Sequence, residues 1–177
     1  KYDEKGLYGT LPFDENPFLE EFHIVIVGKP FVPIISDVKK LGANFCYYKD
    51  IEKELPPKGY LERNYLDYYV FRNNFILKQL AKERWVKSKK LVVAGHSEGS
   101  TIVSKMASIN RKITHLIYSG GNPYGRIMNI LAQSRSFDTD SINEGNNTIE
   151  HWKKVIENPN DTSAISGDSF KTTFSFS

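Results

Sequence analysis

An apolar run that ends in a turn containing glycine and serine lies at the centre of this chain. Residues 91–94 form a short continuous apolar stretch, typical of a central parallel strand covered on both faces. Gly-His-Ser-Glu-Gly follows at 95–99 and fits the G-x-S-x-G pattern, in which a strand turns sharply into a helix. Apolar residues then recur at helical spacing, at Ile102, Val103, Met106 and Ala107. The stretch therefore predicts a buried strand, a tight turn and an amphipathic helix.

The serine of this turn is a candidate nucleophile. In a G-x-S-x-G elbow the serine backbone is strained, and the hydroxyl stands clear of the sheet. Ser97 is therefore the candidate catalytic residue, and Gly95, His96 and Gly99 form the elbow around it. We expect glycine at both ends because side chains there would collide where the strand and helix backbones approach. The alternative is a strand-to-helix turn of the same composition without chemistry.

The elbow and its surroundings resemble the α/β-hydrolase superfamily. Residues 94–99, followed by 113–121, are similar to serine esterases and to dipeptidyl-peptidase- or acylaminoacyl-peptidase-like hydrolases. The likeness covers about residues 20–125, and the elbow is its specific motif. The resemblance implies a doubly wound, mainly parallel sheet and a Ser–acid–His triad. It also implies hydrolysis of an ester, thioester or amide through an acyl-enzyme on Ser97.

The loop after the β-branched run at 22–27 is the second part of the site in this interpretation. The resemblance places one oxyanion donor in this loop, beside the backbone N–H of Glu98. Because Pro30 has no N–H, the donor must be Lys29 or Phe31. An ordinary connection stiffened by prolines is an equal alternative. The side chain of Glu98 is also a candidate to bind a substrate amine, although its N–H is the favoured role.

Alternating strand and helix patterns predict an α/β fold. We expect mainly parallel strands near 22–27, 43–48, 90–94 and 113–118, with helices near 65–84 and 99–109. Weaker patterns predict a strand at 7–11, a short helix at 34–41, an exposed loop at 49–63, and helices at 126–134 and 148–157. Residues 1–124 are interpreted as the N-terminal part of a hydrolase domain, and residues 125–177 as a cap or lid segment of the same domain.

The partners of the serine are not evident in this sequence. A serine nucleophile needs a base and a group that orients the base, and in this superfamily both follow the serine along the chain. After residue 125 the only histidine is His151, on an expected cap helix. We therefore expect the triad acid and histidine to lie beyond Ser177, and no histidine within hydrogen-bond reach of Ser97 Oγ.

The other histidines are better explained as structural residues. His23 and His115 lie inside expected strands, and His96 is too close in sequence to Ser97 to be the base. An unorthodox triad stays open, as does a catalytically inactive, hydrolase-like binding module. A carbohydrate or peptide binder that uses the many tyrosines is a weaker alternative.

Composition narrows the class of protein. The chain has 177 residues, of which 40% are hydrophobic and 25% charged, as in one ordinary globular domain. A net charge of +3 without a dense basic run does not suggest nucleic acid, and no apolar run approaches a membrane span. The single cysteine, Cys46, excludes intrachain disulfides, and we expect it to be buried.

The sequence also suggests what the protein binds. No P-loop, Rossmann glycine pattern or metal-ligand cluster occurs, so we expect neither a cofactor nor a metal. The expected partner is a small-molecule or peptide acyl substrate. The sequence leaves open the oligomeric state and the compartment, and both a cytoplasmic and an exported protein are compatible with it.

Overall fold

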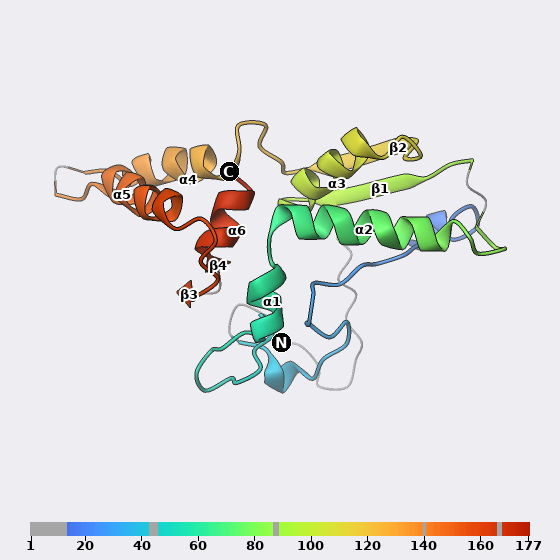
Figure 1. The fold of residues 1–177 in the computed structure, drawn as a ribbon, viewed down its shortest axis with the longest axis horizontal. Coiled ribbons are helices and arrows are strands. Elements are labelled where there is room, and N and C mark those ends of the chain that lie inside the picture. Colours follow the sequence, from blue (N-terminus) through green and yellow to red (C-terminus); the bar gives the residue numbers. More distant parts are fainter. Residues whose placement is uncertain (1–13, 43–45, 87–88, 140, 166–167) are drawn as a thin grey trace.

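The computed structural model describes residues 14–42, 46–86, 89–139, 141–165 and 168–177 (Figure 1). The strand expected at 7–11 lies outside the described residues. In chain order the elements are η1 (Asn16–Phe18), η2 (Val38–Lys40), α1 (Lys58–Arg63), α2 (Leu66–Leu80), β1 (Val92–His96), α3 (Glu98–Ile109), β2 (His115–Ser119), α4 (Arg126–Arg135), α5 (Glu144–Glu157), β3 (Ala164–Ile165), β4 (Asp168–Ser169) and α6 (Phe170–Ser175).

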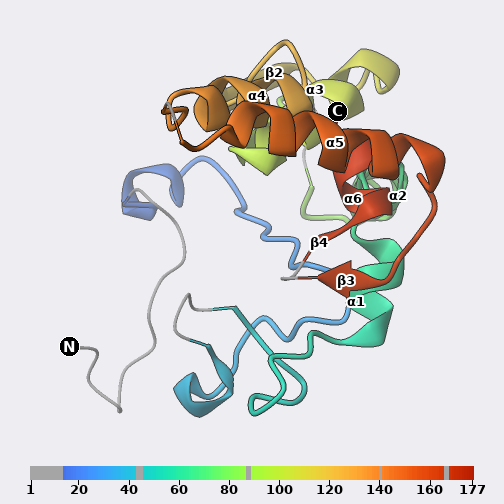
Figure 2. The same cartoon turned by 90° about the vertical axis from the view of Figure 1, so that its left-hand side faces the viewer.

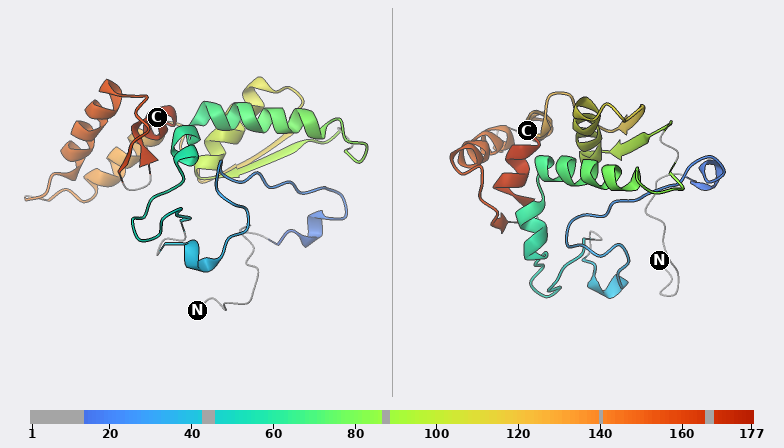
Figure 3. Two further views of the ribbon diagram at one scale, coloured as in Figure 1. Left: turned by 60° about the horizontal axis from the view of Figure 1, so that its bottom comes forward. Right: turned by 45° about the vertical axis from the view of Figure 1, so that its right-hand side comes forward.

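A parallel strand pair forms the centre of the fold. β1 and β2 pair in parallel, in a register that runs from Val92 opposite His115 to His96 opposite Ser119. The connecting helix α3 packs against both strands, and α2 packs against α3 (Figures 1 and 3). The predicted parallel pairing and both predicted helices are confirmed, and the protein is mixed α/β with a small two-stranded parallel sheet.

The hydrophobic core lies between α3, α2 and one face of this sheet. Within β1, Val93 is buried whereas Ala94 is exposed, so α3 covers one face and the other is open. All five side chains of β2 are exposed, including Ile117 at 60%. The expectation of a strand covered on both faces is therefore wrong among the described residues. The buried cluster comprises Leu66, Tyr69, Val70, Val93, Ile102, Val103, Met106 and Phe176.

The N-terminal part of the fold differs from expectation. Residues 22–27 have no strand pairing, and the side chains from Ile24 to Val27 are 37–52% exposed. β-branched residues favour a strand only where a neighbouring strand and a packing surface exist. In the described part of the chain, β1 pairs only with β2, so this run has no hydrogen-bonded neighbour. The prediction of a strand at 22–27 is therefore wrong.

The structure differs from three further predictions in this region. Residues 43–45 lie outside the described part, and Tyr47 makes an isolated antiparallel bridge to Leu41 in place of a parallel strand. That bridge is a local hairpin contact, because only a few residues separate its two sides. Cys46 next to it is exposed, not buried. The helix expected at 34–41 is reduced to the short 3₁₀ turn η2, whose first turn is capped by the Asp37 carboxylate accepting from Lys39 N at 2.9 Å.

The segment after β2 is mainly helical. α4 and α5 pack side by side, α6 packs against α5, and α6 also contacts α2. Figure 1 shows this helical unit beyond the carboxyl ends of β1 and β2, and Figure 2 views it from that side. Its last residues join the core, where Phe176 is buried and its carbonyl accepts from Arg126 N at 3.0 Å.

Some helix boundaries also differ from those expected from the sequence. α5 begins at Glu144, because the Asn143 side chain accepts from Asn146 N at 3.1 Å and caps the helix there. Thr148, the expected start, instead donates to Ser134 of α4 at 2.7 Å. Part of the expected loop at 49–63 is helical, as α1.

Candidate functional site

Ser97 is the single residue between β1 and α3. Its backbone has φ +52° and ψ −120°, a conformation that favours glycine and that few other residues adopt. This geometry reverses the chain from strand to helix in one step. Holding a non-glycine residue there costs on the order of 1–3 kcal/mol. The strain predicted for the serine of the elbow is thus present in the backbone of Ser97.

Hydrogen bonds from both sides hold this turn in place. Ser97 N donates to the carbonyl oxygen of Ser119 at the end of β2, at 2.9 Å. The carbonyl oxygen of Ser97 accepts from Ser100 N at 3.0 Å and from Ser100 Oγ at 2.5 Å. Ser100 is buried, so its hydroxyl is held inside the first turn of α3. The strained residue is therefore tied to both the neighbouring strand and the helix.

The two glycines of the elbow have different roles. A Cβ on Gly95 would collide with the backbone carbonyl of Gly99 and approach Val103 Cγ2 to 2.9 Å. The strand therefore needs glycine here, because the helix backbone crosses directly over it. A Cβ on Gly99 would have nothing within 4 Å. The expectation of a collision at Gly99 is wrong, because a side chain at this position would extend into open space.

Ser97 is exposed, and its hydroxyl makes no hydrogen bond within the described residues. The histidines have other partners. His96 Nδ1 lies 2.8 Å from Ser119 Oγ, and His115 Nδ1 lies 2.9 Å from Thr114 Oγ1. The rings of His23 and His151 pack against Trp85 and Phe170. The prediction that no histidine bonds to Ser97 Oγ is confirmed.

His96 fills the space beside the end of β2. A Cβ on Gly120 would lie 2.9 Å from His96 Cε1, and Gly120 has φ +62°, where a side chain would be strained. The imidazole thus occupies the corner where the two strands end. His96 therefore contacts β2, where its Nδ1 pairs with Ser119 Oγ.

The loop that carries Lys29 and Phe31 lies next to the elbow. Lys29 Nζ forms an ion pair with Glu98 Oε1 at 3.1 Å, a contact between residues 69 positions apart in the sequence. Phe31 has φ +59°. Arg63 Cζ lies over the Phe31 ring, 4.9 Å from the ring centroid. The N–H groups of Glu98, Lys29 and Phe31 make no hydrogen bond within the described part of the chain.

Electrostatics tie Lys29 to two partners. Burial of the ammonium acts to lower its pKa, but the Glu98 carboxylate and Tyr60 outweigh burial, and the pKa of Lys29 is raised above 10.5. Nζ lies 5.6 Å from the centre of the Tyr60 ring. Glu98 stands in the first turn of α3, where the helix dipole also favours a carboxylate. Sequence patterns did not predict the contacts of the Lys29 side chain with Glu98 and Tyr60, because these residues are distant from Lys29 along the chain.

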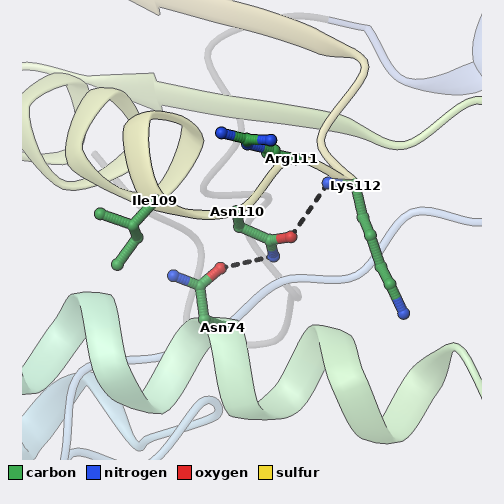
Figure 4. A pocket seen from close by; sticks show the side chains of 5 residues that line it. All are labelled: Asn74, Ile109, Asn110, Arg111 and Lys112. Atoms are coloured by element: carbon green, nitrogen blue, oxygen red, sulfur yellow. Dashed lines mark hydrogen bonds between the residues drawn. The ribbon is translucent and has the colours of Figure 1, made fainter.

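A hollow in the surface lies at the other end of α3. Figure 4 shows Asn74 of α2 facing the turn that follows α3, where Asn110 Nδ2 donates to Asn74 Oδ1 at 2.7 Å. Ile109, Arg111 and Lys112 complete its lining. A helix of this length spans about 18 Å at about 1.5 Å per residue. This hollow is therefore remote from Ser97 and does not serve it.

In the described ranges, no three His, Cys, Asp or Glu side chains gather as a metal ion would require. The helices of those ranges also include none with the length and apolarity needed to cross a membrane. No family model, curated protein or solved structure matches this chain.

Proposed function

We propose that this protein is a serine hydrolase of the α/β-hydrolase type, with Ser97 as the nucleophile. The supporting observation is the backbone of Ser97, an exposed non-glycine residue with φ +52° between a parallel strand and a helix. Strain at one residue is expected where it aims a reactive group. In this proposal the β1–β2 pair is part of a doubly wound sheet, and residues 125–177 are its cap.

The substrate in this proposal is an ester, thioester or amide. Ser97 Oγ attacks the acyl carbonyl carbon, its proton passes to a base, and the carbonyl oxygen becomes an oxyanion. The N–H of Glu98 at the start of α3 donates to this oxyanion, because the first N–H groups of a helix have no partner within it. The second donor is the N–H of Lys29 or of Phe31. Collapse of the tetrahedral intermediate expels the leaving group, and water then releases the acyl group from Ser97.

A catalytically inactive, hydrolase-like binding module is the second candidate. The positions of the histidines favour it, because each histidine contacts another partner and none bonds to Ser97 Oγ. In the hydrolase proposal, none of the described residues is assigned as the base. The two candidates differ in whether the Ser97 hydroxyl is activated.

Covalent labelling separates the two candidates. The full-length protein is treated with a fluorophosphonate, and the adduct is located by mass spectrometry. The serine hydrolase should be labelled at Ser97, and labelling should vanish in Ser97→Ala. Ser108→Ala is the matched control, because Ser108 is an exposed serine on the same helix and bonds only to Lys105 O among the described residues.

Turnover completes the test. Hydrolysis of a short-chain p-nitrophenyl ester should be lost in Ser97→Ala and retained in Ser108→Ala. Aminoacyl and dipeptidyl amides then distinguish a peptidase from an esterase. Undiminished ester turnover by Ser97→Ala would overturn the assignment of the nucleophile. Absence of both labelling and turnover in the unsubstituted protein would favour the binding module.

A further inference from the structure

The carboxylate next to the proposed nucleophile has a cationic partner in the protein itself. Glu98 follows Ser97 directly, and its Oε1 lies 3.1 Å from Lys29 Nζ. The Glu98 side chain is 28% exposed, so it lies at the surface of the site within reach of a bound molecule. A free carboxylate at this position would attract the ammonium group of an amine-bearing substrate. In this protein the Lys29 ammonium takes the place of such a substrate cation beside the Glu98 carboxylate.

Contacts other than the ion pair also hold the Lys29 ammonium beside Glu98. Its ammonium lies over the ring of Tyr60, and the Tyr60 hydroxyl accepts from Asn64 Nδ2 at 2.8 Å. Asn64 is 1% exposed, and its Oδ1 accepts from Tyr69 Oη at 2.8 Å. Tyr69 belongs to the hydrophobic core. The position of Lys29 is thus set by a chain of contacts that reaches the core, in addition to Glu98.

We propose that Lys29 determines the charge selectivity of the site, because it neutralises Glu98 and so removes the advantage that a cationic acyl group would otherwise have over an uncharged one. This inference rests on the proposed function. The paired charges of Lys29 and Glu98 largely cancel at the distance of a bound acyl chain, whereas either charge alone would act on it. Removing the lysine should expose the carboxylate and favour a cation. Removing the carboxylate should leave the lysine unpaired and disfavour a cation.

The test uses two esters of the same shape and different charge. p-Nitrophenyl 4-(trimethylammonio)butyrate carries a permanent positive charge, and p-nitrophenyl 5,5-dimethylhexanoate is its neutral isostere. The readout is the ratio of kcat/KM for the cationic ester to kcat/KM for the neutral ester, measured on the full-length protein. Any effect of a substitution on the oxyanion hole or on folding acts on both esters and cancels in this ratio. A quaternary ammonium excludes titration of the substrate.

Four variants test the charge selectivity: two should change the ratio in opposite directions, and two should leave it unchanged. Lys29→Met should raise the ratio by about three- to tenfold, the size expected for one partly exposed charge. Glu98→Gln should lower the ratio by a similar factor. Lys29→Arg, which keeps the charge, and the double variant Lys29→Met/Glu98→Gln, which removes both charges, should keep the ratio close to that of the unsubstituted protein.

The outcomes are distinguishable. Turnover that depends on Ser97, together with a ratio unchanged in both Lys29→Met and Glu98→Gln, would overturn this inference and leave the proposed function standing. Absence of Ser97-dependent turnover would overturn the proposed function and this inference with it. If Lys29→Met fails to fold, Glu98→Gln still decides the question, because it predicts a change of the opposite sign.

Discussion

The main-chain N–H of Ser97 donates a 2.9 Å hydrogen bond to the carbonyl oxygen of Ser119. This bond continues the β1–β2 pairing one residue past the end of β1, into the residue with positive φ. The neighbouring strand therefore helps to maintain the strained conformation at the point where the chain enters α3.

The first prediction concerns strain at Ser97. Ser97→Gly should be more stable than Ser97→Ala by about 1 kcal/mol, because glycine adopts φ +52° freely and alanine does not. The gain is less than the full strain, since glycine also increases the entropy of the unfolded chain. Urea unfolding of both variants measures the difference. Equal stability would show that the turn is not strained.

The second prediction separates the two glycines of the elbow. Gly95→Ala should destabilise the protein by about 3 kcal/mol, because its Cβ would collide with the Gly99 carbonyl in a region where backbones cannot separate easily. Gly99→Ala is the matched control and should be neutral or stabilise by up to about 1 kcal/mol, because it lies in a helix with open space around it. Denaturant midpoints measure both effects. A mild effect at Gly95 would contradict the close strand–helix crossing.

A third prediction concerns the contact between α6 and the start of α2. Thr172 is fully buried, and its hydroxyl donates to Asn64 O at 2.5 Å. Thr172→Val keeps the shape and removes the donor, so the protein should lose about 1–3 kcal/mol of stability. Thr173→Val, on the same helix and half-buried, is the control and should have little effect. Thermal unfolding that ranks Thr173→Val as the more damaging change would be inconsistent with this contact.

The fourth prediction concerns pH. The pKa of Lys29 is raised in the folded protein, mainly because Glu98 and Tyr60 outweigh the effect of burial. The stabilisation is therefore fully present below the unfolded pKa of 10.5 and is lost as pH rises through the higher folded pKa. The difference in unfolding free energy between the unsubstituted protein and Lys29→Met should stay constant from about pH 7 to 9 and shrink above pH 10.5. Lys39→Met, at an exposed lysine of η2, controls for the loss of one positive charge. A difference that grows above pH 10.5 would reverse the sign of this linkage.

Features encoded by neighbouring residues were predictable. The apolar run at 91–94, the elbow around Ser97 and the helical spacing that follows indicated β1, the turn and α3 in the correct order. Parallel pairing of β1 with β2 also followed, because a strand, a helix and a second strand in succession usually form a parallel crossover unit. The crowding at Gly95 was predictable from the motif, whereas the same argument failed at Gly99, where only the orientation of the helix decided the outcome.

Features that depend on distant partners were not predictable. The run at 22–27 has strand-forming residues, yet a strand exists only where another strand accepts its hydrogen bonds. Asn143 caps α5, whereas Thr148, the expected cap, lies within the helix and donates to Ser134 on α4, a contact between two helices.

The sequence by itself determined the elbow, its strand and its helix, because each depends on residues within a few positions of Ser97. Only the tertiary structure decided what surrounds the elbow. It brought Lys29 to Glu98 across 69 residues and bonded His96 to Ser119. The physical reason is that such contacts depend on how separate elements pack, and packing is set by the burial of their apolar faces, which does not depend on the spacing of the polar residues they carry.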